Sequence, residues 1–191
     1  MKRYCITDSL DVVSYAAASG AEMIQVRAKT LSGRDLLAFA RQAVVRAGGC
    51  PVLVNSRFDI ALAAGAQGVH LPAHSIAPAL IRRLVPSSFR IGVSCHAVDE
   101  IRAAQKEGAD FVVFGPVFTT RSKPGASPVG LPMLREVCRE VEIPVYALGG
   151  VTRANAPLCI EAGAAGVAGI SLFRPGCVTP MMGNGTPRNG G

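Results

Sequence analysis

The chain has 191 residues, of which 49% are apolar and 17% are charged, and this balance is typical of one packed globular domain. So much Val, Ile, Leu and Ala excludes disorder over most of the length. The formal net charge is +7, but three Tyr, seven Phe and no Trp leave little to stack on bases, so nucleic acid is not an expected partner. A basic surface suits small anionic ligands such as phosphates better.

The sequence also argues against a membrane span, a secretion signal and a metal centre. No stretch reaches the roughly 18 consecutive apolar residues of a membrane-spanning helix. Residues 1–8 have too few apolar side chains for the core of a secretory signal. The six cysteines are scattered and form no CxxC pair or Cys/His metal spacing. We therefore expect a cytoplasmic protein with reduced thiols, no membrane partner and no zinc site.

Short β-branched runs alternate along the chain with Ala-rich amphipathic runs, a pattern typical of repeated βα units around a parallel sheet. The first half predicts strands over 4–7, 23–26, 51–55 and 68–71, followed by helices over 11–19, 32–47, 58–64 and 77–84. The second half predicts strands over 90–94, 111–114, 145–148 and 167–171, with helices over 98–107, 132–141 and 153–161. A Gly-Ala pair recurs where a helix ends and a strand begins, a place where glycine turns left-handed without a Cβ penalty.

Eight such strands predict an α/β fold, a compact (β/α)₈ TIM barrel, with an open doubly wound sheet as the alternative. Residues 1–173 are expected to form the barrel. Residues 174–191 are rich in Pro and Gly, have no helical period and are expected to be a disordered tail. The last helix is therefore expected to be missing, which would uncover an apolar flank and allow a homo-oligomer.

In such a barrel the active site lies at the carboxyl ends of the strands, so the residues that follow each strand are the candidates. Arg27 and Lys29, two residues apart, would project to one side and hold an anion, or would form a solvated loop pair. The long loop after the sixth strand carries hydroxyls and a cation that could close over an anion. Its candidates are Thr120, Ser122 and Lys123, and the remaining polar candidates at strand ends are Gln25, Asn55 and Ser94.

Glycines follow the seventh and eighth strands, where barrels of this kind often bind phosphate through backbone N–H groups, although a plain tight turn is the alternative. The candidates for phosphate binding are Gly149, Gly150, Gly169 and Ser171. Two histidines at strand ends, His70 and His96, are candidates for a general acid or base near neutral pH. Each could equally be a structural histidine with satisfied hydrogen bonds.

Seven segments at the strand ends form a specific set: YCITD at 4–8, IQVRAK at 24–29, VNSRFDIAL at 54–62, GVHLP at 68–72, IGVSCH at 91–96, FGPVFTTRSK at 114–123 and ALGGV at 147–151. Together they resemble the thiamine phosphate synthase and thiazole tautomerase (TenI) family, from Tyr4 to about Phe173. The resemblance implies a (β/α)₈ barrel that binds a thiazole phosphate. Synthase members join that thiazole to a pyrimidine methyl diphosphate with Mg²⁺. By resemblance the diphosphate would be held by Gln25, Arg27, Lys29, Asn55 and Lys123, and the thiazole phosphate by Gly149, Gly150 and Ser171.

The chain departs from the synthases at the positions that hold Mg²⁺. Ser56 and Ser75 stand where synthases carry aspartates, and neutral hydroxyls are poor substitutes for carboxylates. Residues 71–78 look instead like the tautomerase branch, whose members move a proton on a thiazole carboxylate phosphate without a metal. Pro116 stands where a tautomerase carries its acid/base histidine, so His96 or His70 would have to move the proton.

We therefore expect a metal-independent thiazole tautomerase with a small phosphorylated thiazole as its ligand and no cofactor. A thiamine phosphate synthase with an altered Mg²⁺ site is the first alternative. A non-catalytic phosphate-ligand binding or regulatory protein is the second.

Overall fold

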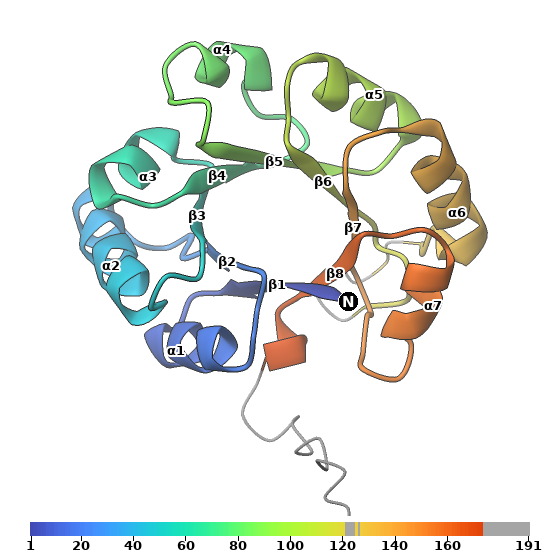
Figure 1. Cartoon of the computed structure of the whole chain (residues 1–191), viewed down its shortest axis with the longest axis horizontal. Coiled ribbons are helices and arrows are strands. Elements are labelled where there is room, and N and C mark those ends of the chain that lie inside the picture. The colour runs from blue at the N-terminus through green and yellow to red at the C-terminus, as the bar shows by residue number, and fades with distance from the viewer. Residues whose placement is uncertain (121–124, 126, 174–191) are drawn as a thin grey trace, which may run out of the picture.

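The computed structural model describes residues 1–120, 125 and 127–173, and in it the parallel strands close into a barrel (Figure 1). The strands follow one another in chain order around the barrel, and the first pairs with both the second and the eighth. This closure confirms the predicted TIM barrel and excludes the open doubly wound sheet. The strands are β1 (Lys2–Thr7), β2 (Met23–Val26), β3 (Val52–Asn55), β4 (Gly68–Leu71), β5 (Arg90–Cys95), β6 (Phe111–Phe114), β7 (Val145–Ala147) and β8 (Gly166–Gly169).

Helices cover the outside of the barrel, each between two successive strands (Figure 1). Within the described residues they are α1 (Leu10–Ala18), α2 (Gly33–Arg46), α3 (Phe58–Ala64), α4 (Pro78–Arg82), α5 (Val98–Lys106), α6 (Gly130–Glu140) and α7 (Ala156–Glu161). The predicted Gly-Ala breaks are confirmed, because a positive φ follows four of these helices, at Gly20, Gly65, Gly108 and Gly163.

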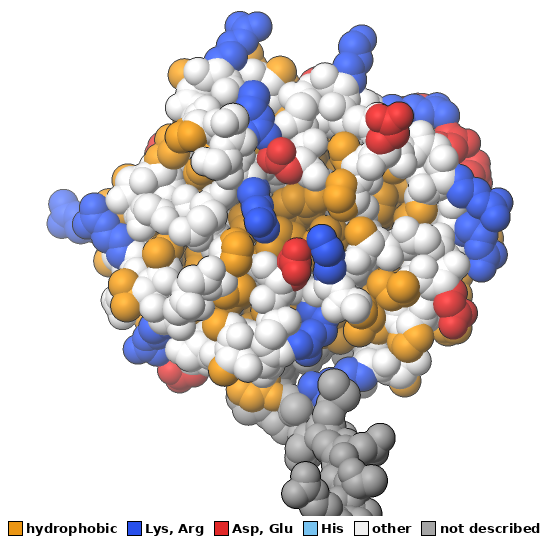
Figure 2. All heavy atoms as spheres, in the orientation of Figure 1, with side chains coloured by type: hydrophobic (Ala, Val, Ile, Leu, Met, Phe, Trp, Pro, Cys, Tyr) orange, Lys and Arg blue, Asp and Glu red, His pale blue; other side chains and the backbone are white. Residues whose placement is uncertain are grey.

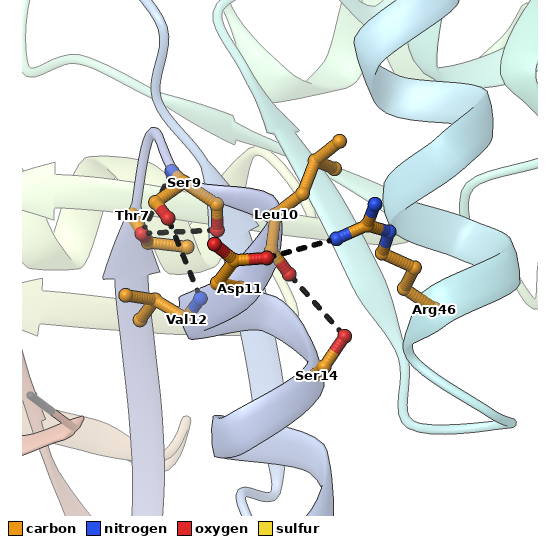
Figure 3. A network of polar contacts seen from close by, with 7 residues as sticks. All are labelled: Thr7, Ser9, Leu10, Asp11, Val12, Ser14 and Arg46. Atoms are coloured by element: carbon orange, nitrogen blue, oxygen red, sulfur yellow. Dashed lines mark hydrogen bonds and ion pairs between the residues drawn. The ribbon is translucent and has the colours of Figure 1, made fainter. Parts of the chain in front are cut away.

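Side-chain hydrogen bonds fix the turn from β1 into α1 (Figure 3). Ser9 caps the helix: its hydroxyl accepts from the N–H of Val12 at 3.5 Å, and its own N–H donates to the hydroxyl of Thr7 at 3.0 Å. Asp11, in the first turn of α1, forms an ion pair with Arg46 of α2 at 3.1 Å. These contacts define where α1 begins and tie it to its neighbouring helix.

Apolar side chains pack on both faces of the barrel wall. The larger cluster lies between the strands and the helices, and a smaller one fills the lumen. In the lumen the ring of Tyr4 meets the rings of Phe111 and Tyr146 at centroid distances of 5.5 and 6.1 Å. The interior of the barrel is therefore a packed core, and a ligand site has to lie beyond it, at an end of the barrel.

The two ends of the barrel differ in their charged groups. Figure 2 shows basic and acidic side chains gathered over the centre of the strand ring. At the amino ends of the strands, Lys2 of β1 forms an ion pair with Glu22, which precedes β2, at 3.3 Å. Arg27 and Lys29 instead lie exposed after β2, at the carboxyl ends. At the carboxyl ends Arg27 and Lys29 therefore offer two exposed cations to an anionic ligand.

The chain after β8 turns into a short 3₁₀ helix, η1 (Ser171–Phe173), so the last strand ends two residues before its predicted end. Leu172 and Phe173 are buried, and the guanidinium of Arg3 lies 5.5 Å from the centre of the Phe173 ring. η1 thus covers part of the flank that a missing helix would expose. The predicted tail, 174–191, and with it the missing helix, lies outside the described residues, and the homo-oligomer stays a prediction.

Candidate functional site

Four polar side chains lie together at the carboxyl ends of β2 to β5. Successive side chains of a strand point to opposite faces, and Gln25, Asn55, His70 and Ser94 share the inward face with the apolar residues of the lumen. Register places Asn55 beside His70, and a side-chain hydrogen bond joins Gln25 to Asn55. We call these four residues the polar half-ring. The structure thus brings together four of the predicted site residues.

Gln25 and Asn55 form a chain of hydrogen bonds that ends at Ser56. Gln25 Nε2 donates to Asn55 Oδ1 at 3.0 Å, and Asn55 Nδ2 donates to Ser56 Oγ at 2.8 Å. The side-chain oxygen of Gln25, Oε1, is buried and has no hydrogen-bond partner among the described residues. A buried acceptor of this kind needs a donor, so the half-ring is built to receive a group that carries one.

His70 is the member of the half-ring that meets the aromatic rings of the lumen, Tyr4 and Phe111. Its Nδ1 is 3.2 Å from the hydroxyl of Tyr4, and its Nε2 is 2.8 Å from the hydroxyl of Ser94. Burial and, to a smaller extent, the positive charge of Arg27 lower the pKa of His70 from 6.5 to about 3. A neutral ring with both nitrogens engaged favours the structural role of His70 over acid/base chemistry.

His96 occupies a different position, exposed beyond the end of β5. Its Nδ1 lies 2.6 Å from the carbonyl oxygen of Gly115, and its backbone N–H donates to a carboxylate oxygen of Glu100 at 2.6 Å. A carbonyl can only accept, so Nδ1 carries the hydrogen and, in the neutral ring, Nε2 carries the lone pair. This orientation is the one that a general base at the rim of the barrel requires.

The glycine turn after β7 is packed against the loop that follows β6. The N–H of Phe118 donates to the carbonyl of Gly149 at 3.0 Å. A Cβ on Gly149 would lie 2.5 Å from Cβ of Pro116, and one on Gly150 would lie 2.4 Å from the carbonyl oxygen of Thr119. Only glycine lets the two loops approach so closely, which places the Gly149-Gly150 backbone at the mouth.

The other candidates lie around the same edge of the barrel, or outside the described residues. Gly169 ends β8, next to β7 in the barrel, and Ser171 is exposed at the start of η1. Arg27 and Lys29 are exposed after β2, and Thr120 is half-buried at the start of the long loop. Ser122 and Lys123 lie outside the described residues, so their predicted role stays a prediction.

Sequence reasoning missed two residues that shape the site. Tyr4 contacts His70 from the middle of a strand, and only the inward alternation along β1 could have indicated it. Asn155 accepts from the N–H of Thr152 at 2.7 Å and donates to the carbonyl of Gly150 at 3.0 Å, which fixes the glycine turn. The Thr-x-x-Asn spacing was the available signal, and the same turn delays α7 beyond its predicted start at 153.

The donor set does not fit a magnesium ion held by carboxylates. Ser56 stands at one of the two positions concerned, and its hydroxyl already accepts from Asn55. Ser75 stands at the other and lies exposed in the loop between β4 and α4. Within the described ranges no group of three or more His, Cys, Asp or Glu side chains could hold a metal ion. We therefore assign no step of a reaction to a metal here.

Comparisons with known proteins agree with the fold and show the family. The sequence profile of a family described as thiamine monophosphate synthase matches residues 2–173. The thiamine-phosphate synthase of Methanoculleus marisnigri is 46% identical over 164 residues, which is 84% of this chain and 78% of the relative. That of Methanocella arvoryzae is 45% identical over 159 residues, covering 82% and 75%.

A solved structure shows the same architecture. Thiamine phosphate pyrophosphorylase from Pyrococcus furiosus superposes with a TM-score of 0.81 at 32% identity, covering 89% of this chain and 85% of that one. The family match extends over the whole described barrel, from β1 to η1. The relatives above carry synthase names, and these matches do not show the tautomerase branch. The chain belongs to the thiamine monophosphate synthase family and to thiamine biosynthesis.

Proposed function

We propose that this protein is a thiamine phosphate synthase, which joins a thiazole phosphate to a pyrimidine methyl diphosphate at the carboxyl mouth of the barrel. The relatives named above support this reaction over the tautomerase that the sequence favoured. The observation that carries the proposal is the polar half-ring, beside the exposed cations Arg27 and Lys29 and across the barrel from the Gly149-Gly150 turn. Two polar subsites facing each other suit two phosphorylated substrates.

The proposed reaction breaks the bond between the pyrimidine methylene carbon and the diphosphate oxygen. The electron pair leaves with the diphosphate, and the nitrogen lone pair of the thiazole then forms the new C–N bond. Arg27 and Lys29, exposed after β2, would balance the growing negative charge of the leaving group. Asn55, fixed by Gln25 and Ser56, would orient it.

A thiazole tautomerase is the second candidate, and two observations favour it. Ser56 and Ser75 supply no carboxylate for Mg²⁺, which a tautomerase does not need. His96 presents the lone pair of Nε2 because Nδ1 donates to Gly115. A proton would pass from a ring carbon of the thiazole to that nitrogen and return at another position, so that no atom is gained or lost.

The experiment that separates these reactions uses the purified full chain with both synthase substrates, with and without Mg²⁺, and measures thiamine phosphate by chromatography. Formation of thiamine phosphate supports the synthase. If the reaction requires Mg²⁺, the protein uses the ion although Ser56 and Ser75 stand in place of the two aspartates. Absence of the product from folded protein refutes the synthase. The unaromatised thiazole carboxylate phosphate is then the substrate to supply: its conversion identifies a tautomerase, and tight binding without conversion identifies a binding protein.

Ser171→Asp is expected to weaken binding of thiazole phosphate by about tenfold to a hundredfold, because a carboxylate would face the phosphate at the end of β8. Ser171 is exposed, so the fold should tolerate the change. Isothermal titration calorimetry measures the affinity, and Ser171→Ala is the matched control with the expected loss of one hydrogen bond only. Unchanged affinity of the aspartate variant would remove Ser171 and the end of β8 from the phosphate site.

We also propose that the protein works in the cytoplasm. No helix in the described part of the chain is long and apolar enough to cross a membrane. Cys5, Cys50, Cys95, Cys138 and Cys159 are free thiols, as a reducing compartment favours.

A further inference from the structure

His70 stands at the junction between the packed lumen and the polar half-ring, with one partner on each ring nitrogen. The Tyr4 hydroxyl lies at Nδ1 and the Ser94 hydroxyl at Nε2, at 3.2 and 2.8 Å. Tyr4 is fully buried and His70 is 3% exposed, whereas Ser94 is half-buried at the end of β5. A neutral imidazole has one N–H and one lone pair, so it donates to one of these hydroxyls and accepts from the other.

The burial of Tyr4 decides the direction of this chain of hydrogen bonds. A buried phenol needs an acceptor for its hydrogen, and within the residues that the structure places, His70 Nδ1 is the hydrogen-bond partner of the Tyr4 hydroxyl. The surrounding lumen consists of apolar side chains and the Phe111 and Tyr146 rings. If His70 donated to Tyr4 instead, the phenol hydrogen would be left unsatisfied there.

We propose that Tyr4 is a positioning residue that holds neutral His70 in the Nε2–H tautomer, so that Ser94 presents its hydroxyl hydrogen to an anionic ligand at the mouth. In this arrangement Tyr4 donates to Nδ1, and Nε2–H donates to Ser94 Oγ. Ser94 therefore does not donate its hydroxyl hydrogen to His70 and can donate it to the ligand. In the opposite tautomer Ser94 would donate to Nε2 and would offer only lone pairs to the ligand, which an anion cannot use.

Two further features agree with this assignment. Burial raises the pKa of Tyr4 well above 10.0, so the phenol keeps the hydrogen that it donates. Phosphate and diphosphate oxygens bind through donors, and in the same half-ring one of the two Nδ2 hydrogens of Asn55 is already bonded to Ser56. A donor fixed at Ser94 therefore adds to what the half-ring offers an anion. The identity of the anion rests on the proposed function, but the tautomer of His70 does not.

The test starts with the unliganded full chain, labelled with ¹⁵N histidine, whose ring nitrogen shifts report the tautomer at neutral pH. Wild-type His70 is expected as the neutral Nε2–H form. Tyr4→Phe removes the donor at Nδ1 and is expected to give a mixture of tautomers. Tyr146→Phe is the matched control, because it removes a second phenol from the same lumen cluster without a contact to His70. The Nδ1–H tautomer in the wild type would overturn the proposal, and this measurement does not require any variant to fold.

The consequence for binding is measured with inorganic pyrophosphate by calorimetry. Ser94→Ala is expected to weaken it by about tenfold, the loss of one hydrogen bond to a charged ligand. Tyr4→Phe is expected to weaken it by about twofold, because an even mixture of tautomers leaves half of the molecules with the Ser94 donor. The double variant should be no weaker than Ser94→Ala, because both changes remove the same donor. Full additivity, or unchanged tautomer and affinity in Tyr4→Phe, would overturn the role of Tyr4. Failure to form thiamine phosphate, with these results intact, would count against the proposed function alone.

Discussion

Replacement of Gly149 by alanine is expected to lower the free energy of unfolding by about 2–5 kcal/mol and to weaken phosphate binding. The new Cβ would strain the backbone at a positive φ and would also overlap with Pro116. Gly149 has a φ of +93°, and a Cβ there would lie 2.6 Å from Cα of Pro116. Pro116 cannot easily move away. The N–H of Val117 donates to the carbonyl of Leu148 at 2.8 Å, which holds the two loops together.

Gly49 provides the matched control for this substitution. Its φ of +95° is nearly the same, but among the described atoms nothing lies within 4 Å of the position that a Cβ would take. Gly49→Ala should therefore show the backbone strain alone, about 1–2 kcal/mol. Urea unfolding followed by circular dichroism gives both free energies, and calorimetry gives the affinity for thiazole phosphate. Equal losses of stability in the two variants would show that the contact with Pro116 is unimportant.

The barrel could be predicted because each of its strands and helices is indicated by the sequence pattern of a short segment. Short runs with β-branched residues alternate along the chain with amphipathic runs, many of them rich in Ala, and this alternation specifies βα units. Five of the eight strand ends agree with their predicted carboxyl ends, at Thr7, Val26, Asn55, Leu71 and Phe114. The predicted ends of other elements differ from the observed ones where contacts with other parts of the fold determine where the element stops. β7 stops at Ala147, before a Leu148 that packs against the lumen cluster, and α4 stops at Arg82 rather than at 84.

The site could be predicted only in part, because a sequence shows neither how deeply a side chain is buried nor which residues contact it. The position of Gln25, Asn55 and Ser94 at strand ends follows from the strand pattern, and the structure joins them in one half-ring. His70 and His96 look alike in the sequence, yet one is sealed between Tyr4 and Ser94 and the other is exposed beside Gly115. The difference arises from contacts between residues far apart in the chain, which no local spacing records.

The burial of His70 predicts an acid-dependent loss of stability that a variant without this histidine should lack. The folded protein keeps the ring neutral down to a pKa of about 3, whereas in the unfolded chain its pKa returns to about 6.5. Between these values the unfolded state binds more protons, so the stability that the neutral ring contributes is complete above about pH 6.5 and is lost as the pH falls. The slope approaches ~1.4 kcal/mol per pH unit, or about 2 kcal/mol between about pH 7 and pH 5.

Urea unfolding at a series of pH values in this window measures the effect. His70→Gln retains an acceptor for the hydroxyl of Tyr4 but does not titrate. Between about pH 7 and pH 5 its free energy of unfolding should therefore fall by about 2 kcal/mol less than that of the wild type. His74→Gln, at an exposed position in the loop after β4, should leave the wild-type slope unchanged. If His70→Gln does not fold, NMR titration of the wild-type ring decides. Protonation of folded His70 near pH 6 would mean that the ring is solvated, and the buried contact with Tyr4 would then have to be abandoned.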